Sequence, residues 1–144
     1  MLDERTVQDV GAALLRIALG VVFLAHSALL KLAIYGMPGT AQFFESLGLP
    51  GVLAYIVVCT EILGGSMLIL GVQARWVALA LTPILIGATW THWPNGWLFT
   101  AANGGWEYPA YLTVMAVACF LIGEGRFVLV RSHPLPVLDA GAAR

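Results

Sequence analysis

Hydrophobic residues fall into four long stretches, and polar residues, glycines and prolines separate them. The stretches are Val10–Leu32, Val52–Leu70, Trp76–Thr91 and Pro109–Ile122. The first two have the roughly 17 to 25 residues that a helix needs to cross a hydrocarbon core of about 30 Å, and the last two are shorter. The pattern predicts an all-α fold, a four-helix transmembrane bundle that forms a single membrane domain over residues 1–144.

The composition supports a membrane protein. The chain is 60% hydrophobic and 10% charged, and its mean hydropathy is +0.87, whereas a soluble domain usually has about 25% charged residues. A net charge of -1 gives no basic surface for a nucleic acid, so no nucleic-acid partner is expected. Aromatic residues stand near the predicted helix ends, as in an interfacial belt: Trp76, Trp90, Trp93, Trp97, Trp106 and Tyr108.

The N-terminal stretch has two interpretations. Arg16 precedes an apolar run, and Ala25-His26-Ser27 is similar to the cleavage site of a secretory signal. The apolar run continues past that site to Leu32, however, so we interpret it as the first transmembrane helix.

Basic residues predict the orientation of the bundle. Lys31 lies near the opposite face, where we interpret it as an interface anchor, whereas five arginines lie on the side that holds both chain ends and the short turn after Leu70: Arg5, Arg75, Arg126, Arg131 and Arg144. The positive-inside rule therefore predicts that both termini are cytoplasmic and that the connections 33–51 and 92–108 face outward. An amphipathic segment in the first of these connections, Thr40–Leu47, predicts an interfacial helix.

Glu61 stands in the middle of an apolar stretch. A carboxylate at the centre of a bilayer is costly and usually faces a partner, a cavity or a proton path. On a helical wheel of 100° per residue, several residues of the first helix fall within a sector of roughly 80°, and His26 lies beside this sector. The residues that can face the interior together with Glu61 are Arg16, Gly20, Phe23, Ser27 and Lys31. Two hypotheses follow, a structural ion pair between Arg16 and Glu61 and a proton path from Glu61 to His26.

The outward connection 92–108 concentrates other polar groups. It contains His92-Trp93-Pro94-Asn95-Gly96 and Asn103-Gly104-Gly105-Trp106-Glu107-Tyr108. Its Asn-Gly and Gly-Gly pairs favour tight turns, so the loop can fold over the bundle as a lid. A tryptophan-rich interfacial loop without a ligand is the alternative.

The remaining chemistry is sparse. Cys59 and Cys119 stand singly, and we interpret both as buried hydrophobic residues. The three histidines do not share a helix at ligand spacing, so no metal site is predicted. No haem, flavin or nicotinamide motif is present, and no covalent cofactor is expected.

From Leu14 to Arg126 the chain resembles the DoxX family of small four-helix integral membrane proteins. The resemblance rests on LLRIALGVVFLAHSALLKL, FFESLGLP, EILGGSMLILG, HWPNG and NGGWEYP, while Ser27 replaces a glycine that is frequent in the family. It implies a link to redox systems, because the family is similar to the membrane subunit of thiosulfate:quinone oxidoreductases. The polar positions that match the family pattern are Arg16, Lys31, Glu61, His92, Asn95, Asn103, Glu107 and Tyr108.

Three functional classes follow. The first is a quinone-linked oxidoreductase subunit of a bacterial cytoplasmic (inner) membrane, with Glu61, His26 and His92 as catalytic proton carriers. Its quinone pocket is predicted at Arg16, Lys31, Asn95, Asn103, Glu107 and Tyr108. A soluble redox partner or another membrane subunit would supply electrons, and a homo-oligomer is compatible with this class. The second class is a small-molecule carrier, and the third is a non-catalytic anchor or assembly factor.

Overall fold

The computed structural model describes residues 3–133, and in this range every regular element is a helix. The first helix, α1 (Glu4–Leu24), continues directly into a π-helical segment, η1 (Ala25–Ile34). The other elements are α2 (Gly36–Ser46), α3 (Val52–Leu70), α4 (Ala74–His92), the short 3-10 helix η2 (Trp93–Asn95) and α5 (Glu107–Ile122). The predicted all-α class is confirmed.

The observed bounds follow the hydrophobic pattern closely. Helix α3 has the bounds that its apolar stretch predicts, and α4 and α5 each begin two residues earlier than predicted. The largest difference is in α1, which begins at Glu4 because the carboxylate of Asp3 accepts a hydrogen bond of 2.6 Å from the Arg5 amide. Such an N-cap satisfies a free amide of the first turn, and the exposed turns before Val10 carry no hydrophobic signal.

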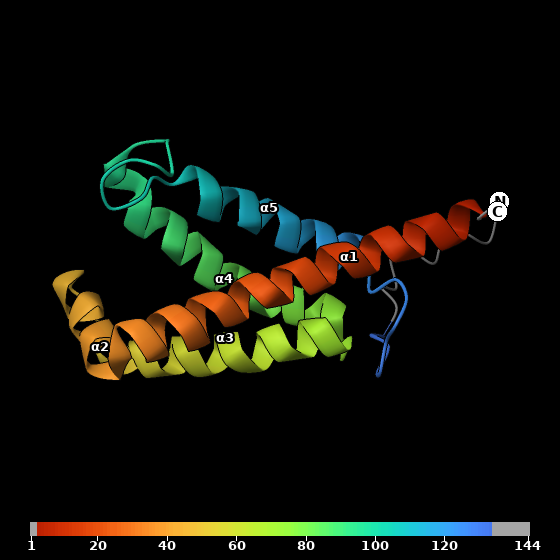
Figure 1. The fold of residues 1–144 in the computed structure, drawn as a ribbon, viewed down its shortest axis with the longest axis horizontal. Coiled ribbons are helices and arrows are strands. Elements are labelled where there is room, and N and C mark those ends of the chain that lie inside the picture. The colour runs from red at the N-terminus through yellow and green to blue at the C-terminus, as the bar shows by residue number, and fades with distance from the viewer. Residues whose placement is uncertain (1–2, 134–144) are drawn as a thin grey trace.

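The helices form two hairpins. Helix α1 lies along α3, and α4 lies along α5 (Figure 1). The hairpins meet at one end of the molecule and diverge toward the end that carries α2 and η2 (Figure 1). Two glycines bring α1 and α3 together, because a Cβ on Gly20 would lie 2.7 Å from the carbonyl oxygen of Gly65. Small residues at such contacts are typical of helices in membranes.

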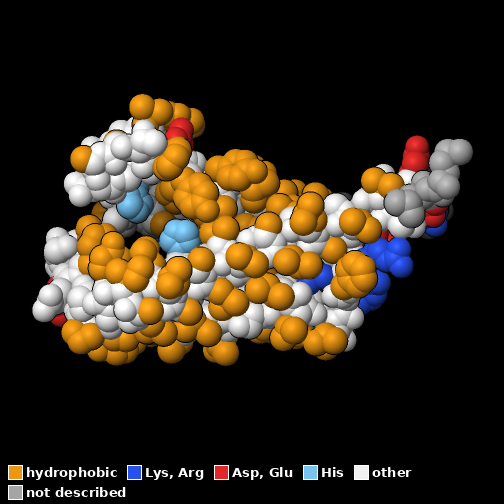
Figure 2. All heavy atoms as spheres, viewed as in Figure 1, with side chains coloured by type: hydrophobic (Ala, Val, Ile, Leu, Met, Phe, Trp, Pro, Cys, Tyr) orange, Lys and Arg blue, Asp and Glu red, His pale blue; other side chains and the backbone are white. Residues whose placement is uncertain are grey.

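The surface is largely apolar. Figure 2 shows hydrophobic side chains over the middle of the bundle, and Leu14, Leu63 and Val114 are each at least 60% exposed. Among the described residues, two helices are long and apolar enough to cross a membrane, the continuous helix Glu4–Ile34 and α3. An apolar surface of this extent suits lipid rather than water.

Candidate functional site

Glu61 is held in an ion pair with Lys31. The Lys31 Nζ lies 2.8 Å from Oε1 and 2.6 Å from Oε2 of Glu61, and the Glu61 side chain is 5% exposed. The hypothesis of an Arg16–Glu61 ion pair is therefore wrong, and so is the interpretation of Lys31 as an interface anchor. The pair joins η1 to α3 in an apolar part of the bundle.

Lys31 lies on the π-helical segment η1, in which backbone hydrogen bonds run between residues five apart. The helical wheel already places Lys31 in the inward sector, and its side chain reaches Glu61 from there. Thr40, which is 5% exposed, donates from Oγ1 to the Lys31 carbonyl oxygen at 3.0 Å. This bond fixes the backbone of Lys31 at the junction between η1 and α2.

His26 stands beside the ion pair at the outward-facing side predicted from the sequence. Its Nδ1 lies 2.9 Å from the Val22 carbonyl oxygen, so Nδ1 carries the proton and Nε2 remains an acceptor. The ring stacks on Tyr108 of α5 with 6.2 Å between ring centroids and an interplanar angle of 27°, which connects the two hairpins. Figure 2 shows histidine side chains at the hollow between them.

Polar side chains in and beside the loop between α4 and α5 form hydrogen bonds with the loop backbone. The Asn95 amide donates to the Gly104 carbonyl oxygen at 2.8 Å, and His92 Nδ1 lies 3.1 Å from the Asn103 carbonyl oxygen. Glu107 Oε1 accepts from the Phe99 amide at 2.9 Å. Four predicted site residues therefore form a separate cluster away from Glu61: His92, Asn95, Asn103 and Glu107.

Arg16 is completely buried at the opposite end of the bundle. Its guanidinium donates to five backbone carbonyl oxygens at 2.6 to 3.1 Å, those of Leu68, Ile69, Glu124, Arg126 and Phe127. These bonds tie α1 to the end of α3 and to residues 123–133, which we call the strap. Because the strap has no hydrophobic periodicity, its return to Arg16 could not be predicted from the residue pattern.

The strap is also held to the turn between α3 and α4. The Val130 amide donates to the Gly71 carbonyl oxygen at 3.0 Å, and the Gln73 amide donates to the Val130 carbonyl oxygen at 2.8 Å. Glu124 is 7% exposed, and its Oε1 accepts from the Ser132 amide at 2.7 Å. Burial by itself raises the pKa of Glu124, but the hydrogen bonds from Ser132 and the charge of Arg75 together hold the pKa below its usual value.

Acid is expected to loosen the strap. Because the pKa of Glu124 is lower in the folded protein, its carboxylate stabilises the fold above the ordinary glutamate pKa of about 4.3, and this contribution is lost as the pH falls through the lower pKa of the folded state. The protection of the strap amides from hydrogen exchange, taken relative to the intrinsic exchange rate at each pH, should therefore fall as the pH is lowered from about 5 to about 3. Glu124→Gln should remove this acid step, and Glu45→Gln on α2 should keep it. An unchanged acid step in Glu124→Gln would contradict the assignment.

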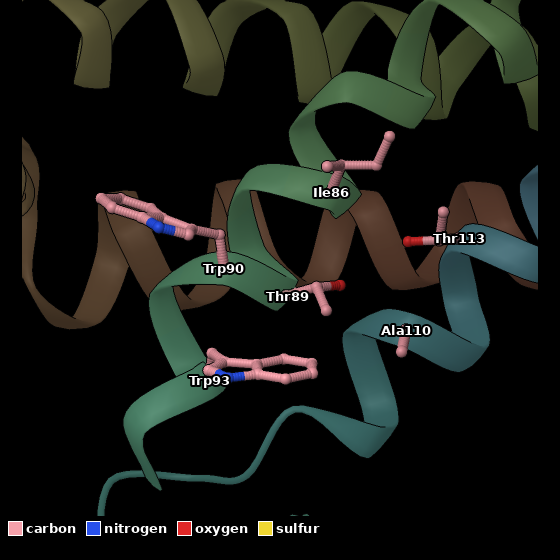
Figure 3. A pocket seen from close by; sticks show the side chains of 6 residues that line it. All are labelled: Ile86, Thr89, Trp90, Trp93, Ala110 and Thr113. Carbon is pink, nitrogen blue, oxygen red and sulfur yellow. The ribbon is translucent and has the colours of Figure 1, made fainter. Parts of the chain in front are cut away.

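Two shallow apolar grooves lie on the α4–α5 hairpin. One of about 440 Å³ is lined by Ile86, Thr89, Trp90, Trp93, Ala110 and Thr113, and Figure 3 shows Thr89 and Trp93 pointing toward Ala110. The other, of about 520 Å³, contains Glu107 and Tyr108 in its wall. Neither groove is lined by Glu61 or Lys31.

The thiols and metal-ligand side chains form no further site in the described part of the chain. Cys119 is buried as predicted, whereas Cys59 is exposed, so the prediction of two buried cysteines is wrong for Cys59 because its face of α3 turns outward. Within residues 3–133, no group of three or more His, Cys, Asp or Glu side chains is placed to hold a metal ion.

Comparison with known proteins places these features in a family context. Residues 11–93, which include Arg16, Lys31 and Glu61, match the model of the DoxX family. A segment of 80 residues is 40% identical to a Bacillus subtilis (strain 168) protein named "Putative oxidoreductase CatD". The match covers 56% of this chain and 58% of that protein, so the chain spans less than two thirds of the relative's length. No solved structure matches the chain.

Proposed function

Because this chain belongs to the DoxX family, we propose that it is a membrane subunit of a redox system that binds a quinone between its helices and passes protons through Glu61. The family is membrane-associated, and the name of the Bacillus subtilis relative points to redox chemistry. The observation that carries the proposal is the ion pair between the buried Glu61 carboxylate and the partly exposed Lys31 ammonium in an apolar bundle.

The proposed topology has four crossings, α1 with η1, α3, α4 and α5. The strap and both termini are cytoplasmic in this proposal, because Arg5, Arg75, Arg126 and Arg131 lie at that end and Lys31 at the other. The multi-pass protein then resides in the bacterial cytoplasmic membrane, with the loop between α4 and α5 facing outward.

The Lys31–Glu61 pair is suited to proton transfer. Two opposite charges in direct contact reduce the cost of holding either one in an apolar medium. Transfer of one proton from Lys31 Nζ to Glu61 converts the ion pair into two neutral groups, so a proton can move between the two side chains without isolating a charge. The hydrogen bond from His26 Nδ1 to Val22 leaves Nε2 without a proton in the neutral imidazole, so Nε2 can accept a proton from the outward side.

A bound quinone would supply the electron-accepting ring, whose reduction by two electrons requires two protons. The support for placing it here is the hollow between the hairpins near the histidines (Figure 2) and the stacked rings of His26 and Tyr108, which favour a planar aromatic neighbour. Electrons come from a soluble partner or another membrane subunit in this proposal.

A non-catalytic anchor is the second candidate, and one observation favours it. Both carboxylate oxygens of Glu61 already contact Lys31 Nζ, and neither groove reaches them. In that case the pair only sets the register of η1 against α3, and partner proteins rather than a small molecule would bind the subunit.

Glu61→Gln is expected to weaken quinone binding at least roughly tenfold, since a carboxylate that exchanges a proton with the ring is lost. The measurement is quinone binding and quinol oxidation by the purified full chain in lipid nanodiscs. Glu45→Gln, which removes a carboxylate from the exposed face of α2, is the matched control and should bind as the wild type does. Equal binding by wild type and Glu61→Gln, or binding by neither, would contradict the proposal.

A further inference from the structure

Two cationic side chains of the strap form no ion pair with the described residues. They are those of Arg126 and Arg131, and both are exposed. Across residues 3–133 the one ion pair within salt-bridge distance is Lys31–Glu61, at the other end of the bundle. Figure 2 shows Lys and Arg side chains gathered where the N-terminal part of α1 leaves the bundle.

The backbone that carries these arginines is fixed before any ligand arrives. The Arg16 guanidinium holds the carbonyl oxygens of Arg126 and Phe127 at 2.7 and 3.0 Å, and the Arg126 amide donates to the Asp9 carbonyl oxygen at 3.1 Å. A preorganised surface loses less conformational entropy when it binds. Glu124, the acidic residue within the strap, is occupied by the Ser132 amide and leaves the exposed arginines free for another anion.

Apolar side chains stand beside the exposed arginines. Phe127 is 74% exposed, Leu129 is 70% exposed and Val130 is 47% exposed. The Arg126 guanidinium carbon lies 5.9 Å from the centroid of the Phe127 ring. Cationic and apolar groups in one short segment match a ligand with an anionic head and a hydrocarbon tail, whereas a soluble anion would leave the apolar groups in water.

We propose that the strap is a binding site for an anionic phospholipid. The phosphate of the headgroup binds the guanidinium groups of Arg126 and Arg131, which supply paired N–H donors. Arg75 adds positive charge at the same end, and the acyl chains lie against Phe127 and Leu129. The site is separate from Glu61 and does not depend on quinone chemistry.

The test uses the full chain reconstituted in nanodiscs of phosphatidylcholine with a minor fraction of phosphatidylglycerol. After extraction, the lipid retained by the protein is quantified by native mass spectrometry. Wild type should retain phosphatidylglycerol in preference to phosphatidylcholine. The double variant Arg126→Gln/Arg131→Gln should lose this preference by roughly tenfold, since each arginine near an anionic surface contributes severalfold to binding.

Arg5→Gln is the matched control, because it removes one positive charge from α1 outside the strap and should keep most of the preference. Folding of the double variant is checked by its unfolding transition, which should persist because Arg16 binds backbone oxygens that both substitutions retain. The proposal is overturned if the double variant retains phosphatidylglycerol like the wild type. It is also overturned if soluble glycerol phosphate displaces the lipid at equal concentration, since the site would then recognise phosphate alone.

Discussion

Arg16→Met is expected to destabilise the protein strongly, by more than a typical single substitution. The guanidinium satisfies five backbone carbonyl oxygens in a fully buried position, and methionine can satisfy none of them. Hydrogen bonds from a charged donor are worth about 1.5 to 3 kcal/mol each and are not additive, so a total loss of about 4 kcal/mol or more is expected. The free energy of unfolding in mild detergent, followed by circular dichroism, measures this loss.

Two variants make the Arg16 result specific. Arg16→Lys keeps the charge but has three donors without the planar fork of arginine, so it should recover only part of the stability. Arg5→Met makes the same chemical change at an exposed position of α1 and should change stability by less than about 0.5 kcal/mol. If Arg16→Met unfolded with the same free energy as Arg5→Met, the role assigned to the carbonyl contacts would be wrong.

The second large effect concerns the Lys31–Glu61 pair. Glu61→Leu leaves the Lys31 ammonium without its carboxylate, and Lys31→Met leaves the Glu61 carboxylate without its ammonium. Lys31→Met should cost about 3 to 5 kcal/mol, because the buried Glu61 carboxylate remains without a partner, and Glu61→Leu should cost less, because the Lys31 side chain is 21% exposed. The double variant Lys31→Met/Glu61→Leu removes both charges and should recover most of the stability.

The double variant also separates the two candidate functions. If the pair relays protons, the double variant folds and inserts but neither binds quinone nor oxidises quinol. If the pair only sets helix register, the double variant keeps every activity of the wild type in the intact membrane system. If the loss of stability in the double variant equalled the sum of the losses in the two single variants, the pairing itself would be contradicted.

The hydrophobic pattern is sufficient for the helices and insufficient for the contacts between them. It predicts Val52–Leu70 with the observed bounds because an apolar run between Gly51 and Gly71 leaves little freedom in where the helix ends. Asp3 and Glu4 lie outside any apolar run, so the start of α1 depends on a cap that the pattern does not contain.

The candidate site, like the fold, could be predicted from the sequence only in part. Glu61 can be recognised from the sequence because a carboxylate in an apolar run is conspicuous. Its partner is predicted wrongly, because the helical wheel places Arg16 and Lys31 in the same inward sector and the position of Lys31 near the helix end favours an interface anchor. The predicted pairing of Arg16 with Glu61 is wrong because Arg16 binds backbone carbonyl oxygens of residues 68–69 and 124–127. Backbone acceptors cannot be recognised from a pattern of side chains.

In the proposed topology, the unequal lengths of the continuous helix Glu4–Ile34 and of α3 determine how the bundle responds to bilayer thickness. The continuous helix has 31 residues and would be about 46 Å long at the α-helical rise, whereas α3 has 19 residues and is about 28 Å long. A hydrocarbon core of about 30 Å is therefore matched by α3 and exceeded by the continuous helix. A thicker bilayer creates hydrophobic mismatch at α3, whereas the longer helix, with its extra turns, is still long enough to cross it.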